Sequence, residues 1–218
     1  MSEAFIFDLD GVIVDTAKYH FMAWKKLCEE LGLQFSIQDN ELLKGVSRRR
    51  SFEIILQLNN RQMDEEAIDA CCQKKNKYYK AYIDQLQKEE ILPGAKEFLC
   101  SARQKGLKVA LGSASKNSKK ILERLEIEGL FDAVVDGHKV KNAKPDPEVF
   151  TEGAKELGVK AENCIVFEDS AAGISAAHSG GMKAVGVGNR SIADYCDYYI
   201  DDFVNADAGV IAKKVSGE

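Results

Sequence analysis

Long apolar runs are missing from this sequence, and so is an excess of basic residues. No apolar segment approaches the ~20 residues that cross a bilayer, and the first residues lack the basic and apolar regions of a secretory signal. Lys and Arg number 30 against 35 Asp and Glu, and the formal net charge of −5 argues against broad nucleic-acid binding. We therefore expect a cytoplasmic protein with no membrane and no nucleic-acid partner.

Metal-ligand spacing is also missing among the six cysteines. They fall mostly in periodic apolar patterns, which predicts buried or half-buried thiols in a reducing compartment. The composition is ordinary for a globular protein, and 218 residues suffice for one large domain or for a core with a smaller second domain.

The first strand predicted in the chain ends in two carboxylates. Ala4 to Phe7 are continuously apolar, which is typical of a strand buried on both faces, and Asp8, Asp10 and Gly11 follow. Residues two apart on an extended chain point the same way, so the two carboxylates share one face. They repel each other unless a cation lies between them or one holds a proton. A metal site with an aspartate nucleophile and an aspartate acid/base meets both conditions; solvated acids that cap a turn or helix are the alternative.

The next part of the chain is predicted to be wholly helical, from about residue 16 to residue 88. Three adjacent arginines, Arg48, Arg49 and Arg50, fill the first turn of one of these helices, where the helix dipole disfavours positive charge. They form either an anion cradle together with the free backbone N–H groups or a solvated basic turn. The helices are expected to begin after Thr16, Ser36, Ser47 and Asp64, with the second ending at Lys44-Gly45 and the last near Lys88.

Strands and helices alternate in the rest of the chain, which predicts an α/β fold with a doubly wound, mostly parallel sheet. The opening strand must pair with these later strands. We therefore predict a core of residues 1–15 and 93–218, with a helical cap of residues 16–92 inserted after the first strand. Ligands bind at the carboxyl ends of such strands, where a cap can exclude water. The later strands are expected at 107–111, 133–135, 164–167, 184–187 and 198–200.

Several polar residues follow these strands or lie in the adjoining loops. Each has an ordinary explanation, such as a turn acid, a helix cap or a surface lysine. Together they supply what phosphoryl transfer through an aspartate requires: a nucleophile, a second acid, a hydroxyl, a cation and further carboxylates for Mg²⁺. They are Asp8 with Asp10, Ser113, Lys144, and Glu168 with Asp169.

The same residues resemble the four motifs of the haloacid dehalogenase superfamily, in the order 8–16, Ser113, Lys144-Pro145 and Glu168-Asp169. The helical insertion directly after the first motif is similar to the cap of its small-cap phosphatases and mutases. Further matches resemble the β-phosphoglucomutase family and extend the resemblance over nearly the whole chain. They are residues 43–48, Ser51, 113–117 and 171–174, together with His20 and Trp24.

The resemblance implies roles for the core residues. Asp8 would be the nucleophile that becomes aspartyl-phosphate, and Asp10 the general acid/base. Mg²⁺ would be held by Asp8, the backbone carbonyl of Asp10 and Asp169, with Glu168 assisting. Ser113 and Lys144 would bind the transferring phosphoryl group. The remaining core contacts to substrate would come from Ala114, Ser115, Lys116 and Asn117.

The resemblance also implies roles in the cap. Arg48 would bind the second, non-reacting phosphate, and His20 would orient Asp10 as the cap closes. Arg49 and Arg50 receive no role from it, and the loop 136–143 departs from the family pattern. The sugar site would be shaped by Trp24, Lys44, Gly45, Val46, Ser51 and Lys75.

The implied reaction interconverts β-D-glucose 1-phosphate and glucose 6-phosphate through an enzyme-bound 1,6-bisphosphate. The alternative within the superfamily is a Mg²⁺-dependent sugar-phosphate phosphatase, which has less use for the anion-binding segment 44–48. A non-catalytic phosphoacceptor module is a third hypothesis, and the large insertion speaks against it. We expect a small sugar phosphate as the binding partner and a monomer.

Overall fold

The chain forms two compact units. The computed structural model describes residues 2–43 and 46–217 and divides into Met1–Asp15 with Gln87–Glu218, here the core unit, and Thr16–Leu86, here the helical unit. The sequence predicted the return to the core at residue 93, whereas the structure places it at Gln87. The reason is backbone pairing: Val14 bridges Ile91, and the N–H of Leu92 donates to the carbonyl of Ile13 over 2.8 Å.

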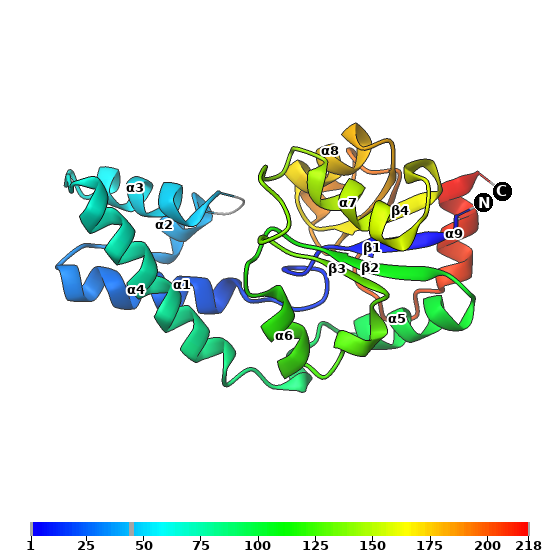
Figure 1. The fold of residues 1–218 in the computed structure, drawn as a ribbon, viewed down its shortest axis with the longest axis horizontal. Coiled ribbons are helices and arrows are strands. Elements are labelled where there is room, and N and C mark those ends of the chain that lie inside the picture. The colour runs from blue at the N-terminus through cyan, green and yellow to red at the C-terminus, as the bar shows by residue number, and fades with distance from the viewer. Residues whose placement is uncertain (1, 44–45, 218) are drawn as a thin grey trace. The chain divides into compact units, whose positions relative to one another are not determined.

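The core unit is built on a six-stranded sheet in the order β3-β2-β1-β4-β5-β6. Every neighbouring pair is parallel, which confirms the predicted α/β class and sheet. Parallel pairing requires crossover connections, and the helices of the core unit provide them (Figure 1). The strands are β1 Ala4–Phe7, β2 Lys108–Gly112, β3 Ala133–Val135, β4 Cys164–Glu168, β5 Lys183–Val187 and β6 Tyr198–Ile200.

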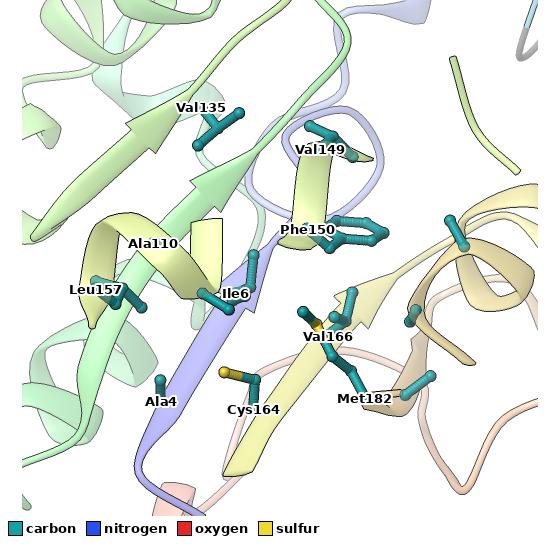
Figure 2. Packing of buried hydrophobic residues seen from close by; sticks show 14 of the residues in the cluster. Ala4, Ile6, Ala110, Val135, Val149, Phe150, Leu157, Cys164, Val166 and Met182 are labelled. Atoms are coloured by element: carbon teal, nitrogen blue, oxygen red, sulfur yellow. The ribbon is translucent and has the colours of Figure 1, made fainter. Parts of the chain in front are cut away.

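Strand β1 lies in the middle of the sheet and is buried on both faces. Phe5 stacks on Phe98 of α5, with ring centroids 6.0 Å apart, on one face. Ile6 belongs to the hydrophobic cluster on the other face, which includes Phe150 of α7 (Figure 2). The alternation of side chains along a strand therefore sends an unbroken apolar run into two separate layers of the core.

Helices cover both faces of this sheet, with α7 and α8 on one side and α5 on the other (Figure 1). The last of them, α9, was not predicted from the sequence. Short 3₁₀ turns, η1 Lys88–Glu90, η2 Glu128–Leu130, η3 Ala161–Asn163 and η4 Arg190–Ile192, complete the connections. The helices are α5 Ala95–Gln104, α6 Ser118–Arg124, α7 Glu148–Leu157, α8 Ala171–Ser179 and α9 Ala208–Ser216.

The helical unit contains α1 Ala17–Leu31, α2 Ile37–Glu41, α3 Arg48–Leu58 and α4 Glu65–Ile83. Three predicted caps are confirmed, because the side chains of Ser36, Ser47 and Asp64 accept backbone N–H groups at their helix starts. The cap predicted at Thr16 is wrong: its hydroxyl hydrogen-bonds the Tyr79 hydroxyl over 3.0 Å instead. Helix α4 also ends at Ile83 rather than near Lys88, and the predicted end of α2 at Lys44-Gly45 falls outside the described residues.

The predicted burial of the cysteines is confirmed. All six thiols are free; Cys28, Cys72 and Cys164 are buried, and the other three are half-buried. Within residues 2–43 and 46–217, none of the helices combines the length and apolar character that crossing a bilayer requires.

Candidate active site

Two neighbouring strands bring three carboxylates together at one edge of the sheet. Phe7 of β1 is paired with Phe167 of β4, and the N–H of Asp8 donates to the Phe167 carbonyl over 3.0 Å. Asp8 directly follows β1, whereas Glu168 ends β4 and Asp169 follows it. One carboxylate oxygen from each of these acids lies within 4.8 Å of the others. The register of two parallel strands is therefore sufficient to build this cluster.

Lys144 reaches the same cluster from the loop before α7. Its ammonium group donates to Asp8 Oδ1 and to Glu168 Oε1, and its Nζ lies 4.6 Å from the centroid of the Phe150 ring. These two carboxylates raise the pKa of Lys144 although burial opposes the charge. Lys144 is therefore a permanent cation placed against the Asp8 carboxylate.

One lysine does not balance three carboxylates, of which Asp8 and Glu168 are buried and Asp169 is half-buried. Burial raises the pKa of Asp8 to about 7; the effect is offset by Lys144 and increased by the charges of Glu168 and Asp10. Burial, followed by the charges of Glu168 and Asp8, raises the pKa of Asp169 to about 8. A divalent cation would relieve this repulsion, and crowded carboxylate oxygens are the ligands that Mg²⁺ prefers. The residues therefore fit a magnesium ion.

Small and polar neighbours support these acids, and no role was predicted for them from the sequence. The N–H and hydroxyl of Ser170 both donate to Glu168 Oε2 over 2.8 Å, which fixes the carboxylate that also binds Lys144. Gly173 has no side chain to collide with Glu168, and Gly11, at φ +78°, leaves equivalent room for Asp169. The sequence signal for Gly173 was its position three residues after Ser170, which caps α8.

Asp10 and the segment 113–117 lie near the ends of strands β1 and β2, respectively. Asp10 is half-buried in a tight turn where the N–H of Gly11 donates to the Val14 carbonyl, and it is not one of the three clustered acids found in the described part of the chain. Ser113 is buried, and its Oγ accepts the N–H of Ser115 over 3.2 Å. The other predicted contacts follow: Ala114 and Lys116 are exposed, Ser115 is half-buried, and Asn117 is buried at the start of α6.

A second group of predicted site residues gathers inside the helical unit. Lys75 is buried, and its Nζ lies 2.8 Å from His20 Nδ1 and 4.8 Å from the centroid of the Trp24 ring. Burial, then the positive charges of Lys75 and Arg48, hold the pKa of His20 well below its usual range. The neutral imidazole therefore accepts from Lys75 at Nδ1 and carries its proton on Nε2.

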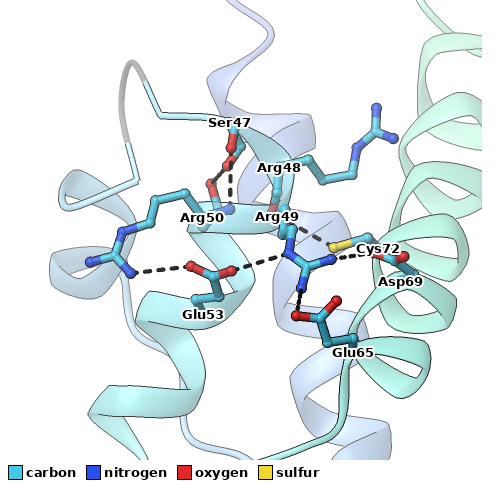
Figure 3. A network of polar contacts seen from close by, with 9 residues as sticks. Ser47, Arg48, Arg49, Arg50, Glu53, Glu65, Asp69 and Cys72 are labelled. Atoms are coloured by element: carbon cyan, nitrogen blue, oxygen red, sulfur yellow. Dashed lines mark hydrogen bonds and ion pairs between the residues drawn. The ribbon is translucent and has the colours of Figure 1, made fainter.

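Arg48 differs from its two neighbours. Arg49 and Arg50 are paired with carboxylates, whereas the Arg48 side chain extends away from those acids, and no ion pair of its guanidinium occurs among the described residues (Figure 3). Of the predicted sugar contacts, Val46 is exposed and Ser51 is buried, with its hydroxyl donating to the Ser47 carbonyl over 3.0 Å. The predicted contacts Lys44 and Gly45 lie outside the described residues.

A comparison with protein families agrees with this site. The site consists of a strand-end aspartate, a lysine and two further acids on a parallel sheet. The model for the haloacid dehalogenase-like hydrolases matches residues 5–187, and the chain belongs to this family. The family matches confirm the resemblance that the motifs indicated.

Particular relatives are more specific. The chain is 43% identical over 188 residues to the β-phosphoglucomutase of Bacillus subtilis strain 168, a match that covers 85% of this chain and 83% of the relative. It is similar to the crystal structure of a β-phosphoglucomutase from Clostridium difficile with a TM-score of 0.92 and 42% identity, covering 100% of this chain and 98% of the other. It is also 35% identical over 182 residues to the fructose-1-phosphate phosphatase YqaB of Escherichia coli K12, covering 84% of this chain and 94% of the relative.

Proposed function

We propose that this protein is a Mg²⁺-dependent mutase that interconverts β-D-glucose 1-phosphate and β-D-glucose 6-phosphate. The observation that carries the proposal is the contact of Lys144 with Asp8 beside two further acids, because it provides both a nucleophile and a cation for a phosphoryl group. Identity of 43% to a β-phosphoglucomutase supports the same reaction. A monomer acting on a small sugar phosphate in the cytoplasm remains part of this proposal.

In the proposed reaction, the protein begins as phospho-Asp8. The C6 hydroxyl of β-glucose 1-phosphate attacks the phosphorus, the bond to Asp8 breaks, and Asp10 takes the hydroxyl proton. The resulting 1,6-bisphosphate turns over in the site, and Asp8 then attacks the C1 phosphate. Asp10 returns its proton to the leaving C1 oxygen, so glucose 6-phosphate leaves and phospho-Asp8 is restored.

Lys144 and Ser113 would bind the phosphoryl oxygens during both transfers, and the positive charge of Lys144 would offset their growing negative charge. The magnesium ion would be held by Asp8, Asp169 and the backbone carbonyl of Asp10, with Glu168 assisting. When bound, it supplies charge neutralisation for the transferring phosphoryl group. Ser170 would keep Glu168 oriented toward Lys144 throughout.

The helical unit would supply the preference for a sugar hydroxyl over water. Arg48 would bind the non-reacting phosphate, so only a substrate with that phosphate would favour the closed arrangement. His20, with its proton on Nε2, would then donate a hydrogen bond that orients Asp10. Two anion-binding groups are needed because the bisphosphate presents each phosphate in turn to Asp8.

The direct test is phosphorus NMR of β-glucose 1-phosphate incubated with the protein, Mg²⁺ and a trace of β-glucose 1,6-bisphosphate. We expect conversion to glucose 6-phosphate without release of inorganic phosphate, and we expect a chelator to stop it. A spectrum dominated by inorganic phosphate would support the phosphatase alternative, for which the E. coli relative at 35% identity is the specific reason. No turnover of any sugar phosphate would leave the non-catalytic phosphoacceptor as the better hypothesis.

Replacing Arg48 by alanine should weaken isomerisation more than hydrolysis. The guanidinium would bind the second phosphate, and only the mutase reaction passes through an intermediate with two phosphates. We expect kcat/KM for isomerisation to fall by about 10²-fold, and release of phosphate from the monophosphate to change much less. Coupled-enzyme and phosphate-release assays on the same preparation give the two rates. Equal losses in both would contradict a second-phosphate site at Arg48.

A further inference from the structure

Arg49 joins three carboxylates across two helices, although no role was predicted for it from the sequence. Its Nε donates to Glu53 Oε1 over 3.2 Å, one turn further along α3. Its Nη1 donates to Asp69 Oδ1 over 2.9 Å, and its Nη2 lies 3.5 Å from Glu65 Oε1 at the start of α4. A single guanidinium therefore ties the first turn of α3 to the first turns of α4 (Figure 3).

These acids also determine which arginine remains available. Three adjacent cations at a helix N-terminus oppose the helix dipole, and Glu53 offsets two of them by pairing with Arg49 and, over 3.2 Å, with Arg50. Arg48 has no acid partner among the described residues. Its backbone carbonyl accepts the Cys72 thiol of α4 over 3.8 Å, so its position depends on how α3 packs on α4.

Carboxylates and phosphates compete for the same donor. Both accept the paired N–H groups of a guanidinium. Glu53 of α3 and Glu65 and Asp69 of α4 carry three negative charges that contact Arg49, the residue after Arg48. Arg49 and Arg50 together neutralise two of these charges. Without Arg49, the acids would attract Arg48 and repel an incoming phosphate.

We propose that Arg49 is a positioning residue: it occupies the acids at the α3–α4 junction and so keeps Arg48 free for the second phosphate of the substrate. The inference rests on the proposed function, because it assumes that Arg48 binds a phosphate. It assigns Arg49 a task in binding and none in the chemical step.

The test compares Arg49→Met with Lys74→Met in the isomerisation assay. Lys74 is a matched control because it is an exposed cation of the same unit, paired with Glu30 at 2.6 Å, and has no acid in common with Arg49. Arg49→Met should raise KM for β-glucose 1-phosphate about tenfold and change kcat by about twofold or less. The reason is that Arg49 would affect how Arg48 binds the phosphate and would take no part in the chemical step. Lys74→Met should leave both constants unchanged. An unchanged KM in Arg49→Met would overturn the inference.

A rescue experiment separates charge neutralisation from a loss of packing. Arg49→Met combined with Glu65→Gln and Asp69→Asn removes the arginine and two of its three acids, and Glu53 keeps its pair with Arg50. We expect KM to return to within about twofold of the original protein, and we expect the KM ratio of Arg49→Met to fall toward one in ~0.5 M salt. A KM that stays raised in the triple variant would show that Arg49 does not act by neutralising these acids. Loss of isomerisation in the original protein would instead refute the proposed function, and the inference would fail with it.

Discussion

Asp8→Asn should abolish turnover. An amide at this position cannot form the acyl phosphate that both half-reactions require, so we expect kcat to fall by about 10⁴-fold or more. The asparagine keeps a carbonyl that can accept from Lys144, so the fold should persist, as thermal unfolding will show. Incubation with β-glucose 1,6-bisphosphate should give an acid-labile phosphoryl adduct, detectable by mass spectrometry, in the original protein and none in the variant.

Asp201→Asn is the matched control for this experiment. Asp201 is exposed and pairs with Arg190 over 3.2 Å at the end of β6. The substitution therefore makes the same change from carboxylate to amide, but away from the three clustered acids. It should retain full turnover and form the adduct. Substantial isomerisation by Asp8→Asn would show that the phosphoryl group does not pass through this residue.

Lys144→Met should reduce kcat by about 10²- to 10³-fold, because it removes the cation that offsets charge on the transferring phosphoryl group. It also leaves Asp8 and Glu168 facing each other without their shared partner. Breaking a buried ion pair from one side costs about 3 kcal/mol of folding free energy. Steady-state kinetics and denaturant unfolding measure the two effects.

The stability loss of Lys144→Met should depend on pH in a defined direction. The pKa of Asp8 is already raised to about 7, and loss of Lys144 raises it further. Above pH ~4, the Asp8 carboxyl has lost its proton in the unfolded chain but keeps it in the folded variant. The stability of the variant therefore falls as the pH rises from ~4 to the raised pKa of Asp8 in the folded state. In chelator, destabilisation should therefore be larger at pH 8 than at pH 5. Lys155→Met, on an exposed pair with Glu152, should show neither effect. A pH-independent loss would argue against the Lys144 contacts.

Local patterns predicted much of the fold. Strands β3 and β6 have the predicted bounds, and helices begin directly after Ser36, Ser47 and Asp64 as predicted. One error occurs where a distant residue competes for the same group. Thr16 could cap α1, but its hydroxyl bonds Tyr79, far along the chain on α4, and a local pattern contains no information on that partner.

The sequence by itself determined the chemistry at the end of β1, since an apolar strand followed by Asp8 and Asp10 already requires a cation or a proton. Only the tertiary structure decided which groups meet that requirement. Lys144 is 136 residues from Asp8 and reaches it because β1 pairs with β4 and the loop before α7 returns to their carboxyl ends. The three arginines also became distinguishable only when α3 packed on α4, because the acids that pair with Arg49 come from both helices and leave Arg48 without an acid among the described residues.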